Sequence, residues 1–271
     1  MVNIDTFDGL RPWIEERIGC SLAEAVKGST VILPNRVQDS EPLLALRIGE
    51  SAFMRVRPTW FEAARDVADG LTLDELFSIF GAYELARVAL AEDVGVWGPS
   101  WYYFGDAAHF SATPAHDVVH LSSEEIDLLA DREIFWHCNW WDAVVSFGIL
   151  DDGQLVALAT VHDQGSPVYE FGVDVAPGSG RQGLGRSVVS AAGKWILQQG
   201  GLILARTAPW NVPSSRLQRS MGLRYIMCDI VGIPGPFRVP PQPLGKPLPD
   251  AELYNYYPDW AMNRGIGSRS G

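Results

Sequence analysis

The sequence has few cysteines and no apolar run that could cross a membrane. Cys20, Cys138 and Cys228 lie far apart without metal-ligand spacing, which favours free thiols in a reducing compartment. A transmembrane helix needs about 18 to 20 apolar residues, and the first 20 residues carry four carboxylates where a signal peptide would have an apolar core. The sequence therefore predicts a cytoplasmic protein that makes no membrane contact.

Basic residues are scarce relative to acidic ones, with 21 Lys and Arg against 33 Asp and Glu and a net charge of −12. Residues 1–130 carry 21 acidic and 9 basic residues, whereas residues 131–271 carry 12 of each. Such an acidic half repels nucleic acid, so no nucleic-acid partner is expected. His109, His116 and His120 have no neighbouring cysteine pair or metal-binding helix motif, so no metal site is expected.

A strand, a glycine-rich loop and a helix follow one another in the second half of the chain. Residues 169–175 alternate apolar and polar side chains, which predicts a strand. From Leu184 apolar residues recur at helical spacing until the glycine pair 200–201. The loop 180–186 contains three glycines and two arginines at the helix N-terminus, where free amides and the helix dipole favour anions. We expect it to bind a phosphate or pyrophosphate.

Two families place a glycine loop between a strand and a helix. Gly178, Gly180 and Gly183 match the G-x-G-x-x-G pattern of dinucleotide-binding domains. That pattern normally has an acidic residue about 20 positions further on and several α/β units behind it. Residues 202–207 carry no carboxylate, and one more helix precedes a proline-rich tail. The dinucleotide interpretation therefore remains an alternative.

Residues 117–233 resemble the GNAT superfamily of acyl-CoA-dependent N-acetyltransferases. The resemblance rests on VDVAP at 173–177, on RQGLGR at 181–186, and on a second motif at 211–223 with its Asn, Ser and terminal Gly-apolar pair. These motifs lie at the separation expected for the family, with a strand between them.

The chain departs from the family pattern at two positions. Gly180 stands first in the family's Q/R-x-x-G-x-G/A, with the arginine displaced to Arg181. Gln218 stands where many members carry the tyrosine that protonates the leaving group. The second departure places the identity of the general acid in question.

The resemblance implies an α/β (α+β) fold, with a mixed central sheet flanked by helices. The domain predictions are an accessory or degenerate GNAT-like lobe at 1–112, the acetyltransferase domain at 117–233, and a proline-rich tail at 234–271 that covers the surface in extended form. A degenerate copy would require a second sheet with the same strand order, and the alternative is a partial helical cap on a single core.

Periodicity and turn residues predict the individual elements. Helices are expected at 7–26, 58–70, 73–91, 122–130, 184–199 and 213–221. Strands are expected at 30–33, 43–48, 52–56, 101–104, 117–121, 143–150, 154–162, 169–175 and 202–206, with a final strand pair within 223–233.

By the resemblance, acetyl-CoA is the acyl donor and no metal takes part. The pantetheine arm would pair with the strand backbone, the pyrophosphate would bind the loop amides, and the second motif would complete the site. The implied cofactor-binding residues are Val173, Val175, Arg181, Gln182, Gly183, Leu184, Gly185, Arg186, Asn211 and Ser214.

Catalysis requires a base for the amine and a proton for the departing thiolate. Glu170, on the strand face opposite Phe171, is the candidate base, acting directly or through water, and Asp174 on the same face is the second candidate. The acid is assigned to Tyr225, with Cys228 or solvent as alternatives.

The segment IFWHCNWWD at 134–142 is unusually aromatic, and by the resemblance this region helps to wall the acceptor site. Tryptophans stack on rings and cations, so Trp136 and Trp140 are candidates for contact with the acceptor, although tryptophans also fill cores. Asp142 could bind the charge of the amine, as could His137.

The resemblance implies an N-acetyltransferase, an acyltransferase of class EC 2.3.1. It would transfer acetyl to a primary amine of a small molecule by direct attack in a ternary complex. Acetylation of a protein N-terminus or lysine, and non-catalytic CoA binding, remain alternatives. A monomer or a homodimer is expected.

Overall fold

The computed structural model describes residues 4–24, 27–36, 39–89, 92–179 and 182–235. Its strands are, in chain order, β1 (Thr30–Pro34), β2 (Leu43–Ile48), β3 (Ser51–Val56), β4 (Val94–Gly105), β5 (Val119–His120), β6 (Val145–Asp151), β7 (Gln154–Asp163), β8 (Val168–Val175), β9 (Leu202–Thr207) and β10 (Arg224–Pro234). Its α-helices are α1 (Leu10–Ile18), α2 (Phe61–Asp69), α3 (Leu73–Leu76), α4 (Ile79–Ala89), α5 (Ser123–Leu129), α6 (Leu184–Gln198) and α7 (Val212–Ser220). Short 3₁₀ helices include η1 (Ile4–Thr6), η2 (Leu22–Glu24), η3 (Pro58–Trp60) and η5 (Trp140–Asp142).

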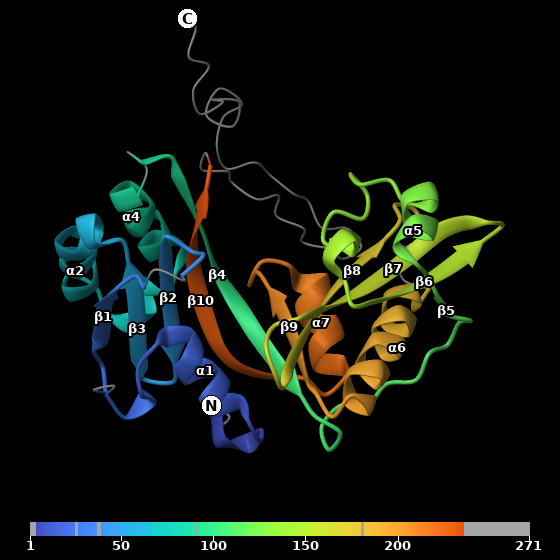
Figure 1. The fold of residues 1–271 in the computed structure, drawn as a ribbon, viewed down its shortest axis with the longest axis horizontal. Helices are drawn as coiled ribbons and strands as arrows, with labels where there is room; N and C mark the ends of the chain where they lie inside the picture. Colours follow the sequence, from blue (N-terminus) through green and yellow to red (C-terminus); the bar gives the residue numbers. More distant parts are fainter. Residues whose placement is uncertain (1–3, 25–26, 37–38, 90–91, 180–181, 236–271) are drawn as a thin grey trace, which may run out of the picture.

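All of these strands join one mixed sheet in the order β1-β3-β2-β10-β4-β9-β8-β7-β6-β5. Figure 1 shows β4 and β10 running side by side through the middle of the molecule, with α2 and α4 beside the first strands and α6 and α7 beside the later ones. A mixed central sheet flanked by helices confirms the predicted fold class.

Helices cover both faces of the sheet, and the two faces can be told apart by adjacent residues of β4. Tyr102 packs with α1 in one buried cluster, whereas Tyr103 packs with α6 in another. Because successive strand residues point to opposite faces, we name these the α1 face and the α6 face. Helices α2 and α4 pack on the α6 face, since they share a cluster with Cys228 and Ile230 of β10.

Local sequence signals set several helix boundaries. Ser122 starts α5 with the predicted capping box, because its hydroxyl accepts from Glu125 N and the Glu125 carboxylate accepts from Ser122 N. The helix expected at 7–26 ends at Ile18, because Gly19 adopts a left-handed φ of 72° and its N–H closes the last turn on Glu15.

The helix expected at 73–91 is divided into α3 and α4. A Cβ at Gly81 would lie 2.0 Å from the carbonyl oxygen of Leu76, so the end of α3 sits directly against the first turn of α4. The break rotates the apolar stripe, so Phe80 and Tyr83, which one continuous helix would place beside Leu76 on its apolar face, are exposed. The assumption of one continuous helix therefore overestimated how many side chains of this segment are buried.

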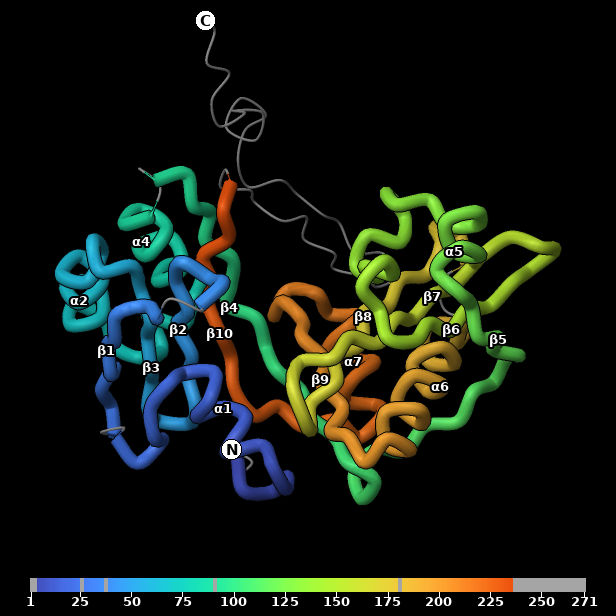
Figure 2. Tube along the Cα trace, in the orientation of Figure 1, coloured from blue at the N-terminus to red at the C-terminus, as the bar shows by residue number. Residues whose placement is uncertain are grey.

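The final strand pair expected within 223–233 is wrong, because β10 is one continuous strand with two register shifts. Its neighbours are β4 and β2, both from the first half of the chain. The tube in Figure 2 shows β10 passing between them. Partners 120 or more residues away cannot be read from the local pattern of β10.

The strand order of the N-terminal half differs from that of the C-terminal half. In the C-terminal half, β7 and β8 are antiparallel and β8 then joins β9 in parallel across α6. In the N-terminal half, β2 and β3 form a hairpin, and β1 pairs with β3 in parallel. The described N-terminal strands thus extend the same sheet and do not repeat the order of the second half. Most of the predicted tail, residues 236–271, lies outside the described residues.

Candidate active site

Strands β8 and β9 form a wedge that opens beyond Glu170. Among the described residues they pair at three positions, from Val168 with Leu202 to Glu170 with Leu204. Val173 and Val175, both predicted to bind cofactor, lie in the diverging part and pair on their other side with Ala159 and Ala157 of β7. Their strand thus offers backbone groups to a ligand in the wedge.

The N-terminus of α6 lies beside this wedge. Gly183 is its N-cap, with a φ of 82°, and within the described chain no side chain caps the helix. A Cβ at Gly185 would lie 3.3 Å from Val175 Cγ2, so the first turn, which begins at Leu184, packs closely on β8. The free amides of this turn and the positive end of the helix dipole favour an anion here.

Side chains around the loop are mostly engaged within the protein. The backbone oxygen of Gln182 lies 2.6 Å from His116 Nε2. Arg186 Nη1 donates to Ser220 Oγ at 2.9 Å, which ties α6 to the end of α7. Arg181 lies outside the described residues. The backbone amides are therefore the anion-binding groups that the structure presents.

The second motif forms the first turn of α7. Asn211 Oδ1 accepts from Ser214 N at 3.2 Å, and Ser214 Oγ accepts from Gln218 Nε2 at 2.9 Å. Gln218, at the position of the family's tyrosine, is 2% exposed, and its Oε1 has no partner among the described residues. Asn211 and Ser214 are thus placed by helix capping.

Glu170 lies where the wedge begins, on the α1 face. Arg206 of β9 donates to both of its oxygens, at 2.6 and 2.8 Å, and this carboxylate raises the pKa of Arg206 well above its usual range. The Arg206 guanidinium lies over the ring of Tyr102, whose hydroxyl donates to Asp229 at 2.5 Å. A row of charged and polar groups therefore crosses from β8 to β10.

Sequence reasoning missed Arg206, Tyr102 and Asp229. The alternation within β9 places Arg206 on the face of Leu204, so the signal for this residue was present. Its pairing with Glu170 depends on the parallel register of β8 and β9, which no local pattern shows.

Tyr225, the predicted acid, is not brought together with Glu170. It packs against Tyr103 and Trp101, on the α6 face. Strands β4 and β9 lie between β10 and β8, which separates the backbones by roughly 14 Å at the usual strand spacing. Burial raises the pKa of Tyr225, which also weakens it as a proton donor.

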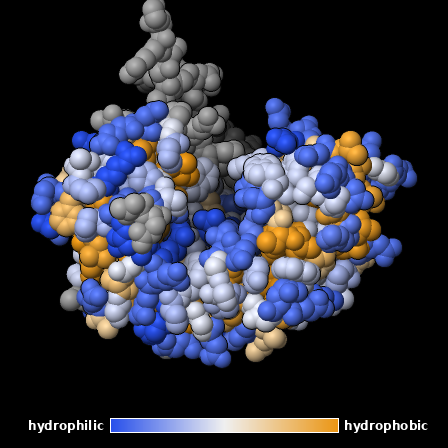
Figure 3. Space-filling view, in the orientation of Figure 1, coloured by the Kyte–Doolittle hydropathy of each residue, from blue (hydrophilic) through white to orange (hydrophobic). Residues whose placement is uncertain are grey.

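The aromatic segment 134–142 packs on β8 through His137, which bonds Asp174 twice, from its backbone N at 2.8 Å and from Nδ1 at 2.6 Å. Trp136 is 49% exposed, but Trp140 is 1% exposed and donates to Asp127, so Trp140 is a core residue. Asp142 lies 3.2 Å from His162 Nδ1. In Figure 3, hydrophilic side chains predominate in the middle of the visible face, between the two halves.

The wedge between β8 and β9 and the glycine-capped N-terminus of α6 thus lie side by side. Residues 115–223 match the family model described as Acetyltransferase (GNAT) family. The match covers less than half of the chain. A comparison with curated proteins finds no matching sequence.

Solved structures similar to the chain include proteins described as GNAT-family acetyltransferases. A GCN5-related N-acetyltransferase from Kribbella flavida is 21% identical with a TM-score of 0.43, and the match covers 56% of this chain and 64% of that one. A GNAT-family acetyltransferase from Colwellia psychrerythraea is 17% identical with a TM-score of 0.40, covering 55% and 61%. The aminoglycoside N-acetyltransferase AAC(6')-Iy in complex with CoA is 18% identical with a TM-score of 0.34, covering 41% and 88%.

These identities and TM-scores are too low to carry an argument about function. The chain spans less than two thirds of the length of the first two structures. In the part of this chain that the structure describes, no helix is long and apolar enough to cross a membrane. The same residues contain no group of three or more His, Cys, Asp or Glu side chains arranged to hold a metal ion.

Proposed function

We propose that the GNAT domain transfers an acetyl group from acetyl-CoA to a primary amine of a small molecule. The observation that carries the proposal is the divergence of β8 from β9 directly beside the glycine-capped N-terminus of α6. An extended pantetheine arm fits the unpaired backbone at Val173 and Val175, and a pyrophosphate fits the amides from Gln182 to Arg186.

In this proposal the amine attacks the thioester carbonyl, the C–S bond then breaks, and the departing thiolate takes a proton from solvent to leave as the thiol of CoA. Alignment of two bound reactants can supply several kcal/mol of the barrier without a covalent intermediate. Glu170 serves as the base, and the Arg206 pair fixes its orientation. Each carboxylate oxygen has a second lone pair, so Glu170 can still accept a proton through water. The proposal leaves Tyr225 out.

A small acceptor is favoured by the surroundings of Glu170. Side chains of α1 pack on the same sheet face on one side, and the segment 134–142 is fixed to β8 on the other. Trp136 and Asp142 are exposed near this space and are proposed to contact the acceptor.

The first test is calorimetric titration of the full chain with acetyl-CoA. Gly183→Asp places a carboxylate at the anion-binding end of α6 and is expected to weaken acetyl-CoA binding by at least about 100-fold, which corresponds to about 2.7 kcal/mol. The matched control is Gly200→Asp at the other end of α6, where φ is 72° and, as at Gly183, the space around a Cβ is open. Both variants carry a similar backbone strain, so melting curves separate folding from binding.

An equal loss of acetyl-CoA affinity in both variants would contradict the assignment of the pyrophosphate site to the N-terminus of α6. Binding of NAD(H) or NADP(H) in place of acetyl-CoA would favour the dinucleotide alternative. A thiol-release assay with a panel of amines then decides between an enzyme and a CoA-binding protein, because the latter binds acetyl-CoA without consuming it.

A further inference from the structure

His162 is a titratable residue beside Glu170 that the proposed reaction does not yet use. It lies on β7 directly across from Glu170 of β8, and both side chains point to the α1 face, because their neighbours Val161 and Phe171 pack in the cluster of α6. Directly opposed residues of antiparallel strands have Cβ atoms about 4.5 to 5.5 Å apart. An imidazole thus stands next to the proposed base, where the wedge begins.

Two neighbours fix the imidazole ring of His162. Its Nδ1 lies 3.2 Å from Asp142 Oδ1, and its Nε2 lies 3.0 Å from Thr160 Oγ1. An ionised carboxylate only accepts hydrogen bonds, so the neutral ring carries its proton on Nδ1. Nε2 then keeps a lone pair, to which the Thr160 hydroxyl donates. A Cβ at Gly172 would lie 3.2 Å from Thr160 Oγ1, so this basic end of the ring is the one near β8.

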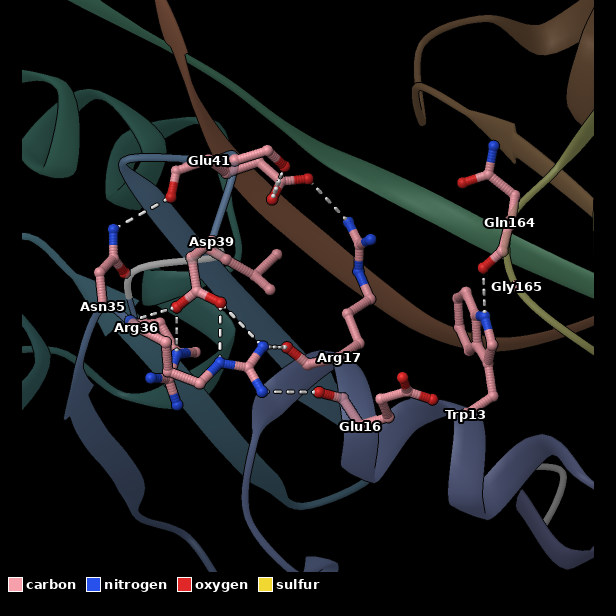
Figure 4. Close-up of a pocket in the computed structure, with 12 residues that line it drawn as sticks. Trp13, Glu16, Arg17, Asn35, Arg36, Asp39, Glu41, Gln164 and Gly165 are labelled. Atoms are coloured by element: carbon pink, nitrogen blue, oxygen red, sulfur yellow. Dashed lines mark hydrogen bonds and ion pairs between the residues drawn. The ribbon is translucent and has the colours of Figure 1, made fainter.

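The elements that carry these groups are held by other contacts as well. Trp13 Nε1 of α1 donates to the carbonyl oxygen of Gln164 at 2.7 Å, which fixes the chain directly after β7 to α1 (Figure 4). The aromatic segment that carries Asp142 is bonded to β8 through His137. The geometry of the ring and its carboxylate is therefore set by the fold and does not depend on their own hydrogen bond.

Charged side chains lie on every element that packs around His162. They are Asp142 of η5, Glu170 and Asp174 of β8, His137 of the aromatic segment, Arg206 of β9, and Glu16 and Arg17 of α1. Arg206 pairs with Glu170, and His137 pairs with Asp174. Asp142 is therefore the carboxylate placed to compensate a positive charge on the imidazole.

Glu170 is poorly suited to keep a proton that it has taken up. Arg206 donates to both of its oxygens, at 2.6 and 2.8 Å, and protonation of the carboxylate leaves this guanidinium without its counter-charge. The proton is therefore held weakly on Glu170. A water molecule can bridge two side chains that are too far apart for a direct hydrogen bond, so the opposed imidazole is within reach of this proton.

We propose that His162 is the second proton acceptor of the candidate active site, and that the proton taken by Glu170 from the acceptor ammonium passes through water to Nε2 of His162. The Glu170 carboxylate is restored, the Thr160 hydroxyl rotates to accept from the new Nε2–H, and Asp142 stabilises the imidazolium. The side chain of His162 is 14% exposed, so the imidazolium can return its proton to solvent after the product has left. Asp142 is a positioning residue in this step, and the inference rests on the proposed acetyl transfer.

His162→Gln keeps hydrogen-bonding groups at this position but has no basic nitrogen. We expect its kcat to fall at least about tenfold, with the KM for acetyl-CoA unchanged, because a positioned proton-transfer group acts on the chemical step. The matched control is His120→Gln, since His120 lies exposed on β5 of the same sheet with its ring against Phe147. An unchanged kcat of His162→Gln in an active protein overturns this inference alone. A native chain that neither binds nor consumes acetyl-CoA overturns the proposed function and this inference with it.

The pH profile of kcat separates proton transfer from packing. Native kcat should fall on the acid side as His162 becomes protonated, because the imidazolium cannot take a second proton. In His162→Gln this fall should move to lower pH, since carboxyl groups titrate below imidazoles. The same acid limb in both proteins would show that His162 only packs. Added imidazole should also raise the turnover of His162→Ala, and no increase would count against the proposal.

The tautomer of His162 is tested without any substrate. In nitrogen NMR spectra of the full chain with isotope-labelled histidine, assigned by comparison with His162→Gln, the neutral ring of His162 should carry its proton on Nδ1. A proton on Nε2 overturns the proposal, because that nitrogen would then have no lone pair to accept another. Asp142→Asn keeps an acceptor for Nδ1–H but removes the charge that stabilises the imidazolium, so its kcat should fall. An unchanged kcat of Asp142→Asn overturns the role given to Asp142.

Discussion

Asp229 is a carboxylate that the fold holds in its core, at 1% exposure. Tyr102 donates to one of its oxygens, and the other, Oδ1, has no partner among the described residues. Burial raises the pKa of Asp229 above its usual value, although Arg206 and the Tyr102 hydroxyl oppose the shift. The folded state therefore favours the protonated acid more than the unfolded chain does.

This shift predicts the sign of a pH effect on stability. A raised pKa gives a stabilisation that is fully present below the unfolded value, 3.8, and is lost as pH rises through the folded pKa. Asp229→Asn removes this loss while keeping an acceptor for Tyr102, so its melting temperature relative to the native protein should rise as pH increases from 4 towards neutral.

Asp39 provides the control with the opposite sign. Burial alone would raise the pKa of Asp39. Hydrogen bonds from Arg36 and Arg55 lower this pKa by a larger amount, so the net shift is downward. Its stabilisation is present above the unfolded value and is lost as pH falls, so Asp39→Asn should cost most at neutral pH. Parallel pH dependences of the two variants in thermal melts would contradict the different environments assigned to these carboxylates.

The residues that could be predicted from the sequence are those whose role depends on local geometry. Gly183 was placed at a helix N-terminus by the change of period at Leu184, and Glu170 was placed on its face by strand alternation. Arg206 reaches Glu170 through a contact between distant segments, so no local pattern could identify it. Trp140 could not be distinguished from Trp136, because both read as aromatic residues of one loop.

At the scale of elements, segment 134–142 and strand β8 are held close together. A Cβ at Gly172 would lie 2.3 Å from the backbone oxygen of His137. Nothing larger than glycine fits there unless the aromatic segment moves. The position of Trp136 and Asp142 relative to Glu170 thus depends on a glycine at position 172. The need for glycine there follows from the packed structure and not from the sequence of β8.

Gly172→Ala is expected to lower stability by about 1 to 3 kcal/mol, the usual cost of overpacking, and to raise the KM for the acceptor more than that for acetyl-CoA. The matched control is Gly148→Ala in β6, where the nearest atom to a Cβ is Leu121 Cδ1 at 2.4 Å, the end of a side chain that can move. An equal loss of stability in both variants, measured by denaturant unfolding, would show that the backbone contact is not special.

At the scale of the whole molecule, the segment that matches the GNAT family model does not contain all of its own sheet. Strand β4, from the N-terminal half, lies between β9 and β10 and pairs with both. Residues 115–223 alone leave β9 with one exposed edge that pairs with nothing. We therefore propose that residues 1–112 are an accessory lobe that residues 117–233 require for folding.

Splitting the chain between Thr113 and Pro114, in the segment that joins β4 to β5, tests this dependence. We expect fragment 114–271 alone to give no cooperative unfolding transition by circular dichroism, and co-expression with fragment 1–113 to restore one together with acetyl-CoA binding. A fragment 114–271 that melts cooperatively by itself would contradict the accessory role, and failure of the co-expressed pair would show that covalent continuity is needed.

The place of β10 between β2 and β4 also sets the timing of folding during synthesis. The N-terminal half cannot close its sheet when it leaves the ribosome, because the strand that joins β2 to β4 ends at residue 234. Domain-by-domain folding from the N-terminus, the usual route for longer chains, is therefore not open to this protein. The edges of β2 and β4 that face β10 stay unpaired until residue 234 has been made, which makes assistance by a chaperone advantageous.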